Sequence, residues 1–479
     1  MDYDQFLFIE KGLRGGISMV SKRHCRANNP LVPGHDPKKP TTHIMYLDAN
    51  NLYGWAMSQH LPTGGFEWVE RPQELNVSGH PDDAEKEYIL EVDLEYPRGL
   101  HDSHNEYPLA PERLKVQEAW MSQYQQDLLG RLGGSTETEK LVPNLRNKER
   151  YVVHYRNLKL YLELGLKLTK IHRALEFDQS PWMEPYIRLN TKLRKLAASD
   201  FEKDLYKLMN NSVFGKTMEN LRRSVDVKLV RSNEEDRLRK LIAKPNFARS
   251  KVFDDDLAAM HMYKTNLYLN RPVYVGMSVL DLSKLLMYDF YYNHMKQVYG
   301  DRTRLLYTDT DSLLLEIETE DIYEDMESNN DHYDTSDYQG NHPLHSNVNK
   351  KVLGKMKDEC AGTPIQEYVG LRPKMYSILK ADQTNIKKAK GVKKNVVKKQ
   401  IRHEQYKECL FHKKVFQHGM NMLRSEGHKM YGLRMTKQSL SPFDSKRWIA
   451  DDGIATLAYG HKNARTPLDE YVEELLNEL

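Results

Sequence analysis

The fold of the chain is decided by one stretch, Leu305-Leu306-Tyr307-Thr308-Asp309-Thr310-Asp311-Ser312-Leu313-Leu314-Leu315. Two apolar runs flank a short acidic turn, which predicts a buried β-hairpin with a polar tip. The runs do not alternate with polar residues, so we expect strands in the middle of a sheet, covered on both faces. Two carboxylates so close together repel each other, and a divalent cation would offset that repulsion. Asp is also common in ordinary turns, so this candidate metal site needs support from elsewhere in the chain.

Size and composition are typical of a soluble globular protein. The chain has 479 residues, 39% of them hydrophobic and 29% charged, which is enough for more than one domain. No apolar run approaches the length of a membrane span, and the N-terminus has no signal-peptide pattern. We therefore expect an intracellular protein, nuclear or cytoplasmic, with no membrane partner. The cysteines Cys25, Cys360 and Cys409 are far apart and are expected to be free thiols.

The net charge is only +3, but the charges are segregated along the chain. Residues 381–400 hold seven lysines and one aspartate, whereas residues 311–340 hold eleven acidic residues and neither Lys nor Arg. The basic block is either an ordinary solvated surface or a track for nucleic-acid phosphates. The acidic segment from 316 to 340 is expected to be a solvated insertion.

A second acidic site is predicted where an early strand ends. The apolar run 43–47 predicts a strand that stops at Asp48, and residues 49–57 indicate a turn into a short helix. Asp48 could therefore bind a ligand at the strand end or simply cap the helix. The run 88–97 offers a similar acid, Asp93, and these runs alone do not decide between the two.

Helices are expected in several other regions. Residues 130–200 are predicted to be mainly helical, including 155–174, and a further helix covers 189–208. A buried helix is predicted over 278–298, after a strand or turn at 272–277. The C-terminal tail is expected to be charged and mostly helical.

Lys203, Lys207 and Asn211 share one helix face because they are four residues apart. Two lysines on one face with no acid between them repel each other unless an anion lies opposite. An exposed helix also tolerates such a pair, so the spacing alone leaves both readings open.

Together and in this order, the acidic stretches resemble the motifs of family B DNA polymerases. The match is closest to the protein-primed branch of Maverick/Polinton-type mobile elements, linear plasmids and viruses. Asp48-Ala-Asn-Asn-Leu-Tyr53-Gly resembles the first palm motif, Asp-x-x-Ser-Leu-Tyr-Pro, and Tyr307-Thr-Asp309-Thr-Asp311-Ser resembles the second, Tyr-x-Asp-Thr-Asp-Ser. Only Asp48 has the downstream Leu-Tyr, so the resemblance favours it over Asp93.

Three more stretches extend the resemblance over nearly the whole chain. Lys207-x-x-x-Asn211-Ser212-x-Phe214-Gly215 resembles the fingers motif, Lys-x-x-x-Asn-Ser-x-Tyr-Gly. Lys374-Met-Tyr376 resembles the Lys-x-Tyr motif at the start of the thumb. Arg14-Gly15-Gly16 resembles the loop that joins an exonuclease domain to the polymerase domain; its glycines permit a close backbone approach to a partner, and Arg14 adds a charge.

The resemblance implies a mixed α/β (α+β) fold with right-hand polymerase architecture, in which an antiparallel sheet forms the palm and helices form the fingers and thumb. It implies a linker with the Gly-Gly loop (1–40), a first palm part (41–130), a helical insertion with the fingers (131–225), a second palm part (226–375), and the thumb with a basic tail (376–479). No acidic exonuclease motifs precede the Gly-Gly loop, so a polymerase core without proofreading is expected.

The chain departs from the family pattern at three motif positions. Asn51, Gly54 and Phe214 stand where the pattern has Ser, Pro and Tyr. None of these changes removes a charge that the chemistry requires, and Phe214 keeps the aromatic surface expected to stack near the nascent base pair.

The resemblance implies DNA-templated transfer of a dNMP to a primer 3′-hydroxyl or a protein primer, with two Mg²⁺ ions or Mn²⁺ in their place. Its partners would be primer–template DNA, dNTPs and a terminal (primer) protein. Asp48 and Asp311 are the implied metal ligands, Asp309 is the third catalytic residue, and the bulk of Tyr53 would exclude ribonucleotides. The remaining implied contacts are nucleotide binding by Lys195, Lys203, Lys207, Asn211 and Phe214, and DNA binding by Arg14, Gly15, Gly16, Ser212, Gly215, Lys374, Tyr376, Lys387, Lys388, Lys390, Lys393 and Lys394.

Three other functions are weighed against this one. A catalytically inactive DNA-binding remnant of a mobile element is disfavoured by the intact acids. A terminal transferase or RNA-templated polymerase keeps the same site, and Tyr53 favours deoxyribonucleotides as its substrates. A structural nucleic-acid protein whose acids merely cap turns would not contain four motifs in this order.

Overall fold

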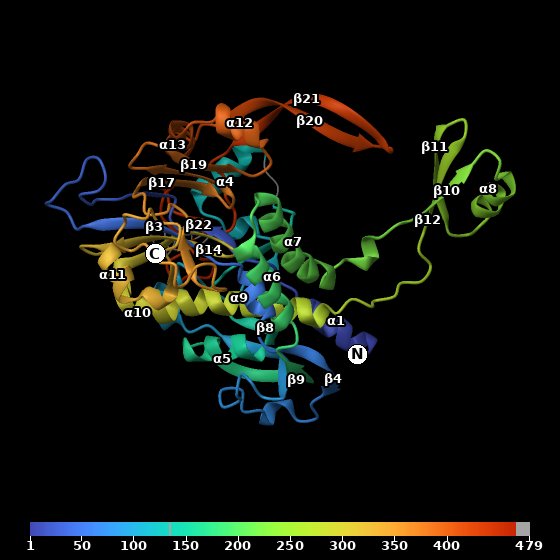
Figure 1. Cartoon of the computed structure of the whole chain (residues 1–479), viewed down its shortest axis with the longest axis horizontal. Helices are drawn as coiled ribbons and strands as arrows, with labels where there is room; N and C mark the ends of the chain where they lie inside the picture. Colours follow the sequence, from blue (N-terminus) through green and yellow to red (C-terminus); the bar gives the residue numbers. More distant parts are fainter. Residues whose placement is uncertain (134–135, 466–479) are drawn as a thin grey trace, which may run out of the picture.

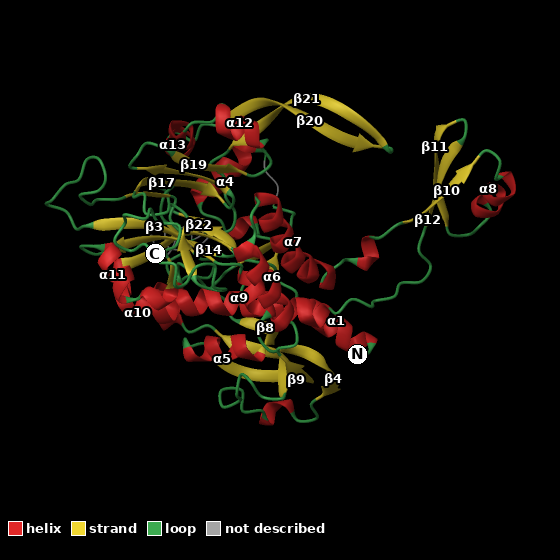
Figure 2. Cartoon of the chain, in the orientation of Figure 1, coloured by secondary structure: helices red, strands yellow, loops and turns green. Residues whose placement is uncertain are grey.

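The predicted hairpin lies at the centre of the main sheet. The computed structural model describes residues 1–133 and 136–465, and Figures 1 and 2 show β3 and β14 of the main sheet in the body of the molecule. Within this part the main sheet has six strands in the order β1-β13-β14-β3-β16-β15. Its strands are β1 (Ser18–Val20), β13 (Thr303–Asp309), β14 (Ser312–Glu318), β3 (Thr42–Ala49), β16 (Met356–Asp358) and β15 (Tyr333–Asp334). All neighbours are antiparallel except β15 and β16.

The apolar runs of β13 and β14 do not alternate because both faces of the sheet are buried. Successive residues enter two different cores: Leu305, Leu313 and Leu315 join one cluster, and Leu306 and Leu314 join the other. All five side chains are at most 1% exposed. The predicted central hairpin is therefore confirmed.

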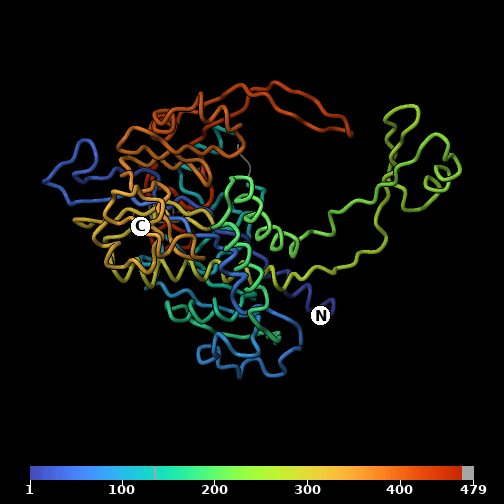
Figure 3. The backbone as a smooth tube through the Cα atoms, viewed as in Figure 1, coloured from blue at the N-terminus to red at the C-terminus, as the bar shows by residue number. Residues whose placement is uncertain are grey.

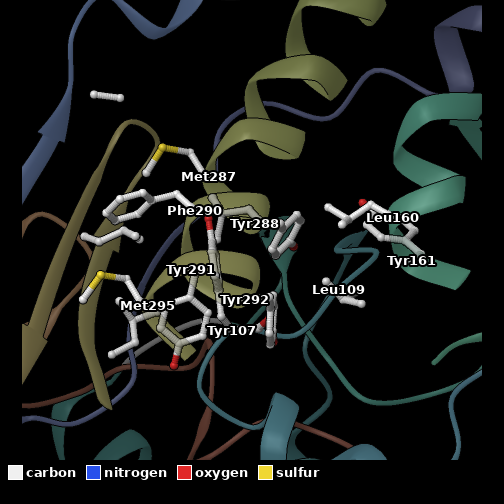
Figure 4. Close-up of a cluster of buried hydrophobic side chains, with 14 of the residues drawn as sticks. Tyr107, Leu109, Leu160, Tyr161, Met287, Tyr288, Phe290, Tyr291, Tyr292 and Met295 are labelled. Atoms are coloured by element: carbon white, nitrogen blue, oxygen red, sulfur yellow. The ribbon is translucent and has the colours of Figure 1, made fainter. Parts of the chain in front are cut away.

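One long helix covers the first of these faces. α9 (Val273–Asp289) continues through a π-helical segment (Phe290–Met295) into α10 (Lys296–Tyr299). Figure 4 shows the tyrosines of this segment gathered around Tyr107, and the ring centroids of Tyr107 and Tyr288 are 4.5 Å apart. The buried helix predicted over 278–298 is confirmed, whereas the strand or turn expected at 272–277 is wrong because the helix already begins after Pro272.

A second sheet packs against the opposite side of α9. Its order is β4-β9-β5-β8, and its strands are β4 (Leu61–Trp68), β9 (Lys167–Ser180), β5 (Lys86–Glu95) and β8 (Lys148–His154). Helix α1 (Tyr3–Lys11) and α9 share one apolar cluster with this sheet, and α5 (Tyr155–Glu163) follows β8. The helical prediction for 155–174 is thus wrong beyond Glu163, because β9 pairs with β5 from Lys167 to Asp178.

The segment between these strands holds short elements. Between β5 and β8 these are α3 (His101–His104), β6 (Glu112–Leu114), α4 (Gln123–Leu132) and β7 (Lys140–Val142), whereas α2 (Leu52–Met57) precedes β4. The prediction of a mainly helical 130–200 region is therefore only partly correct.

Two helices stand beside the main sheet. α6 (Glu184–Leu196) and α7 (Asp200–Thr217) form a pair that packs on α2 and α9 (Figure 1). The single helix predicted over 189–208 is wrong, because the chain breaks after Leu196 and Ser199 starts a new helix. The Ser199 hydroxyl accepts a hydrogen bond from the Glu202 amide, as in a capping box.

A small module lies apart from the body, between α7 and α9. It contains β10 (Asp226–Arg231), α8 (Glu235–Ile242), β11 (Phe247–Asp254) and β12 (Leu257–Met262), and two extended segments connect it to the rest (Figure 3). Its His261 meets His428 at the tip of another hairpin, with 2.8 Å between the Nε2 atoms. The predicted second palm part, 226–375, therefore includes a separate module.

The C-terminal region contains mainly strands. A sheet of order β19-β18-β17-β2 uses β17 (Ile365–Arg372), β18 (Met375–Lys380), β19 (Asn385–Ala389) and β2 (His24–Arg26). It is followed by α12 (Lys394–Lys399), α13 (His403–Phe411) and a long hairpin of β20 (Phe416–Glu426) and β21 (Lys429–Leu440). The mostly helical tail is therefore wrong, and the part of the predicted thumb and tail at 466–479 lies outside the described residues.

After the hairpin the chain returns to the body through β22 (Trp448–Ile449) and β23 (Thr456–Leu457). The buried Arg23 donates to the carbonyls of Gly453 (2.8 Å) and Leu371 (3.1 Å), which ties this return segment to the C-terminal sheet.

The acidic segment is not the solvated insertion that was predicted. It forms α11 (Ile322–Ser328) and β15, and the side chains of Ile322, Met326, Tyr333 and Tyr338 join the main core. The cysteines are buried and free, as predicted. Within the described ranges, no helix combines the length and the apolar character needed to cross a membrane.

Glu367 joins the C-terminal sheet to α13. Its carboxylate lies 2.8 Å from His24 Nε2 and 3.1 Å from both His403 Nε2 and Lys407 Nζ. Burial alone would raise the pKa of Glu367, but the hydrogen bonds from His24, His403 and Lys407 outweigh it and hold the pKa well below its ordinary value.

Glu367→Gln is expected to destabilise the protein at neutral pH by about 1–3 kcal/mol, because the bonds to a buried carboxylate are lost. In the native protein this contribution is complete above about pH 4.3, the ordinary pKa of a glutamate, and is lost as the pH falls towards the lower pKa of the folded state. The Tm should therefore fall less steeply in the variant between about pH 5 and about pH 3, the upper part of the range in which the native protein loses this contribution. Parallel pH profiles of Tm would contradict this role.

Candidate active site

Three aspartates lie where neighbouring strands of the main sheet end, and we call this end of the sheet its catalytic-candidate edge. Asp48 lies near the end of β3, Asp309 ends β13, and Asp311 occupies the turn before β14. The register pairs Asp48 with Ser312, and the Ala49 amide donates to the Asp311 carbonyl at 2.7 Å. The pairing of β3 with β14 therefore brings Asp48 and Asp311 side by side.

Asp48 does not cap the next helix. Helix α2 begins after Asn51, whose φ of 44° places it in the left-handed region. The competing acid Asp93 lies on β5 in the second sheet, where it accepts a bond from the Arg150 amide and pairs with His172 at 2.8 Å. The geometry therefore favours Asp48 as the partner of the hairpin acids.

The electrostatics of the edge favour a cation. Burial, then Asp311, then Glu359 raise the pKa of Asp48 to about 8, and burial is also the main cause of the raised pKa of Asp311. Asp309 is already neutralised by Lys374, whose Nζ lies 2.7 Å and 2.8 Å from its two oxygens. Two uncompensated carboxylates suit a hard divalent cation. Among the described residues no three His, Cys, Asp or Glu side chains converge on one point, so such a cation would take its other ligands from outside these side chains.

The Gly-Gly loop packs on the catalytic turn. The Thr310 amide donates to the Ile17 carbonyl at 2.7 Å, and a Cβ on Gly16 would overlap the Thr310 side chain. Arg14 points inward: its guanidinium lies 3.7 Å from the Tyr151 ring centroid and donates to the Val152 carbonyl at 2.7 Å. The prediction that the Arg14 side chain contacts DNA is therefore wrong.

An aromatic stack connects the strand edge to the helix pair. Tyr53, in the first turn of α2, stacks on Phe214 of α7 with ring centroids 4.4 Å apart and an interplanar angle of 29°. Lys207, on the same helix as Phe214, lies close enough to lower the pKa of both Asp48 and Asp311. The elements that carry the two predicted motifs thus face each other.

Comparison with known proteins gives the family. Residues 29–296 match the model of DNA polymerase type B, organellar and viral. The chain belongs to this family of type B DNA polymerases. No curated protein matches the chain by sequence.

Solved structures agree on the fold. Phi29 DNA polymerase complexed with primer-template DNA and incoming nucleotides is 17% identical with a TM-score of 0.53, covering 92% of this chain and 63% of that one. An orthorhombic crystal form of Phi29 DNA polymerase is 15% identical with a TM-score of 0.50, covering 96% and 62%. The chain thus spans less than two thirds of the length of Phi29 DNA polymerase, and it shares the right-hand fold of that protein.

The predicted nucleotide-binding residues are only partly gathered at the edge. Lys207 faces the carboxylates, whereas Lys203 pairs with Asp200 at 3.0 Å and Lys195 is exposed on α6. Asn210 is buried and accepts from Asn190 at 2.9 Å, while its neighbour Asn211, the predicted residue, is half-buried.

Lys374 and Tyr376 are the residues of the predicted thumb motif. Lys374 donates a hydrogen bond to the Asp309 carboxylate, whereas Tyr376 is buried, with 3% of its surface exposed. Its hydroxyl lies 2.9 Å from that of Tyr46, and its ring packs on Tyr307 at 4.7 Å. The predicted DNA contact of the Tyr376 side chain is therefore not supported by this structure, because that side chain is packed in the core against Tyr46 and Tyr307 of the main sheet.

The other predicted DNA contacts are mostly at the surface. Lys387 is partly buried and donates to the Ile401 carbonyl at 2.5 Å. Exposed residues of the predicted set are Gly15, Ser212, Gly215, Lys388, Lys390, Lys393 and Lys394.

Three groups near the edge were missed. Lys446 donates to the Ser18 carbonyl at 2.8 Å; burial lowers its pKa to about 8, and Asp309 is among the charges around it. The charge of Glu359 raises the pKa of Asp48, and Arg194 lines a cavity that Lys207 also lines. No local pattern marks these residues, because the chain brings them to the site from distant segments.

Gly16→Ala is expected to destabilise the protein by about 1–3 kcal/mol, because the added methyl group has to displace Thr310 in a packed turn. Gly15→Ala is the matched control, since a Cβ at Gly15 has no described heavy atom within 4 Å. Urea or thermal unfolding of both variants measures the difference. Equal stabilities would mean that the loop is not tightly packed on the turn.

Proposed function

We propose that the chain is the core of a DNA-directed DNA polymerase that adds a dNMP to a primer 3′-hydroxyl. The observation that carries the proposal is the arrangement at the sheet edge. Asp48 and Asp311 are adjacent and uncompensated, Lys207 faces them from α7, and the Tyr53–Phe214 stack adjoins them. Primer–template DNA and dNTPs are the proposed partners, and a terminal protein is a further candidate.

Asp48 and Asp311 are the residues that would hold Mg²⁺, or Mn²⁺ in its place. When bound, two such ions would activate the primer 3′-hydroxyl and stabilise the leaving pyrophosphate. Lys374 forms an ion pair with Asp309, so the other two carboxylates are the proposed metal ligands. Lys207 would orient the triphosphate and offset its charge in the transition state.

The proposed division of the chain follows the sheets rather than the predicted ranges. The main sheet with α9 would be the palm, α6 and α7 the fingers, and the C-terminal sheet with the β20–β21 hairpin the thumb. The exposed lysines Lys388, Lys390, Lys393 and Lys394 lie at the base of this hairpin, where they would bind duplex phosphates without reading sequence.

The alternative is an inactive DNA-binding remnant. It is less consistent with the site, because an unused pair of buried like charges is destabilising and has no reason to persist. The two functions are separated by activity rather than by DNA binding.

Asp48→Ala and Asp311→Ala should each reduce primer extension with dNTPs and Mg²⁺ by at least about a thousandfold. Because each change removes one of two repelling carboxylates, Tm should not fall, and duplex affinity should stay within about threefold. Asp93→Ala is the control and should extend normally. Extension by either variant of the edge would refute the metal assignment, and an inactive native chain that still binds DNA would favour the remnant.

Tyr53→Val should admit ribonucleotides, because the ring that stacks on Phe214 would no longer block a 2′-hydroxyl. Tyr53→Phe keeps the ring and is the matched control. The ratio of kcat/KM for dCTP and CTP measures the effect, and a fall of about tenfold or more is expected only in the Val variant. An unchanged ratio would exclude Tyr53 from sugar selection.

A further inference from the structure

A small polar cavity lies behind the proposed active site. It has a volume of about 100 Å³ and is lined by Asn50 and Asn51, which closely follow Asp48 in sequence. Four cationic side chains from separate segments also line it: Arg194 from α6, Lys207 from α7, Lys351 from the segment between β15 and β16, and Lys357 from β16. The cavity therefore joins the helix pair to the main sheet next to the catalytic edge.

The acids in the cavity wall are already engaged. Asp334 accepts from the Asn50 side chain at 2.7 Å and from the Lys351 amide at 2.7 Å, and its pKa lies below its ordinary value although burial opposes this. Asp337 pairs with Lys357 at 2.7 Å. These carboxylates are therefore not free to neutralise the charges of Arg194, Lys207 and Lys351.

Three of these cations have no direct ion-pair partner in the described part of the chain, although Lys207 faces the carboxylates of Asp48 and Asp311 and the charge of Asp337 acts on Lys351. Within the described residues, the side chains of Arg194, Lys207 and Lys351 make neither an ion pair nor a hydrogen bond, and Arg194 Nε is buried without a partner. Burial lowers the pKa of Lys351, and the charges of Arg194 and Lys203 lower it further. Converging cations without direct ion-pair partners in a partly buried site indicate a place for an anion.

The backbone at Lys351 is strained. Its φ of 54° lies in the left-handed region, which a residue with a Cβ adopts at a cost of roughly 1–2 kcal/mol. The hydrogen bond from the Lys351 backbone amide to the Asp334 carboxylate holds this conformation. Asp334 also accepts a hydrogen bond from the side chain of Asn50, which lies two residues after Asp48. The segment that carries Lys351 is thus fixed to the catalytic strand.

We propose that Lys351 is a palm-side ligand of the nucleotide polyphosphate and of the pyrophosphate product, opposite Arg194 and Lys207 of the helix pair. The inference rests on the proposed polymerase function and adds to it a cation outside the recognised motifs. A volume of about 100 Å³ is far below that of a pocket for a whole nucleotide, so only phosphate groups would enter. Arg194, rather than the exposed Lys195, is then the α6 residue that binds the phosphates.

The first test measures binding of inorganic tripolyphosphate to the full chain by isothermal titration calorimetry. Lys351→Asn is the informative variant, because Asn adopts left-handed backbone more readily than most residues and should keep the fold. Its affinity should fall at least tenfold, whereas Lys350→Asn, at an exposed neighbour, should stay within about twofold. Equal affinity of Lys351→Asn and the native chain, at unchanged Tm, would overturn the proposal.

The second test uses primer extension. Lys351→Asn should raise KM for dNTP and the inhibition constant for pyrophosphate by about tenfold, with little change in kcat or DNA affinity, and Lys351→Arg should restore most of the loss. Extension by Lys351→Asn with native constants would refute this inference and leave the polymerase function intact. An inactive native chain that binds tripolyphosphate through Lys351 would refute the polymerase function and leave the anion site.

Discussion

The repulsion between the carboxylates of Asp48 and Asp311 is the constraint on which the rest of the structure depends. The antiparallel register of β14 and β3 places the two acids together, and their partial burial at the end of a sheet covered on both faces limits the screening of their charges by water. Lys207 and Lys357 offset only part of this charge, since the pKa of Asp48 still rises to about 8. An acidic edge of this kind is stable in the charged form only when it binds a cation, which is also what nucleotidyl transfer requires.

The backbone around this edge is held in strained conformations. Asn51, Thr310 and Lys374 all have φ between 44° and 64°. Thr310 lies between Asp309 and Asp311, Lys374 bonds Asp309, and Asn51 starts the helix after Asp48. Conformations of this kind persist only when their surroundings fix them. The contacts that hold this backbone extend into the core. The buried Lys284 of α9 donates a hydrogen bond to the Arg14 carbonyl at 2.9 Å, and the Ile17 carbonyl in the following loop accepts a hydrogen bond from the Thr310 amide. The helix that fills the core therefore also sets the geometry of the turn.

The sequence predicted best what short-range patterns determine. The hairpin, the strand before Asp48 and the helix over 278–298 are all recognisable from their own residues. β9 was predicted as helix because its leucines and lysines suit both structures, and pairing with the distant β5 decided the outcome. A family motif gives residue identity but not exposure, so Arg14 and Tyr376 were assigned to DNA although both are buried. Lys351 belongs to no motif, and only the folded chain brings it to Arg194.

The Tyr53–Phe214 stack and the cationic cavity are complementary. With ring centroids 4.4 Å apart, the two rings are in van der Waals contact, so no nucleotide can lie between them. A base that stacked between these rings would require α7 to move relative to α2. Such a movement separates favourable aromatic contacts worth roughly 0.5–1.5 kcal/mol, which binding has to offset. A polyphosphate bridging Lys207 and Lys351 would supply this compensation, since it attracts the helix pair and the sheet to the same anion. Selection of the sugar and capture of the phosphates would then depend on one movement of α7.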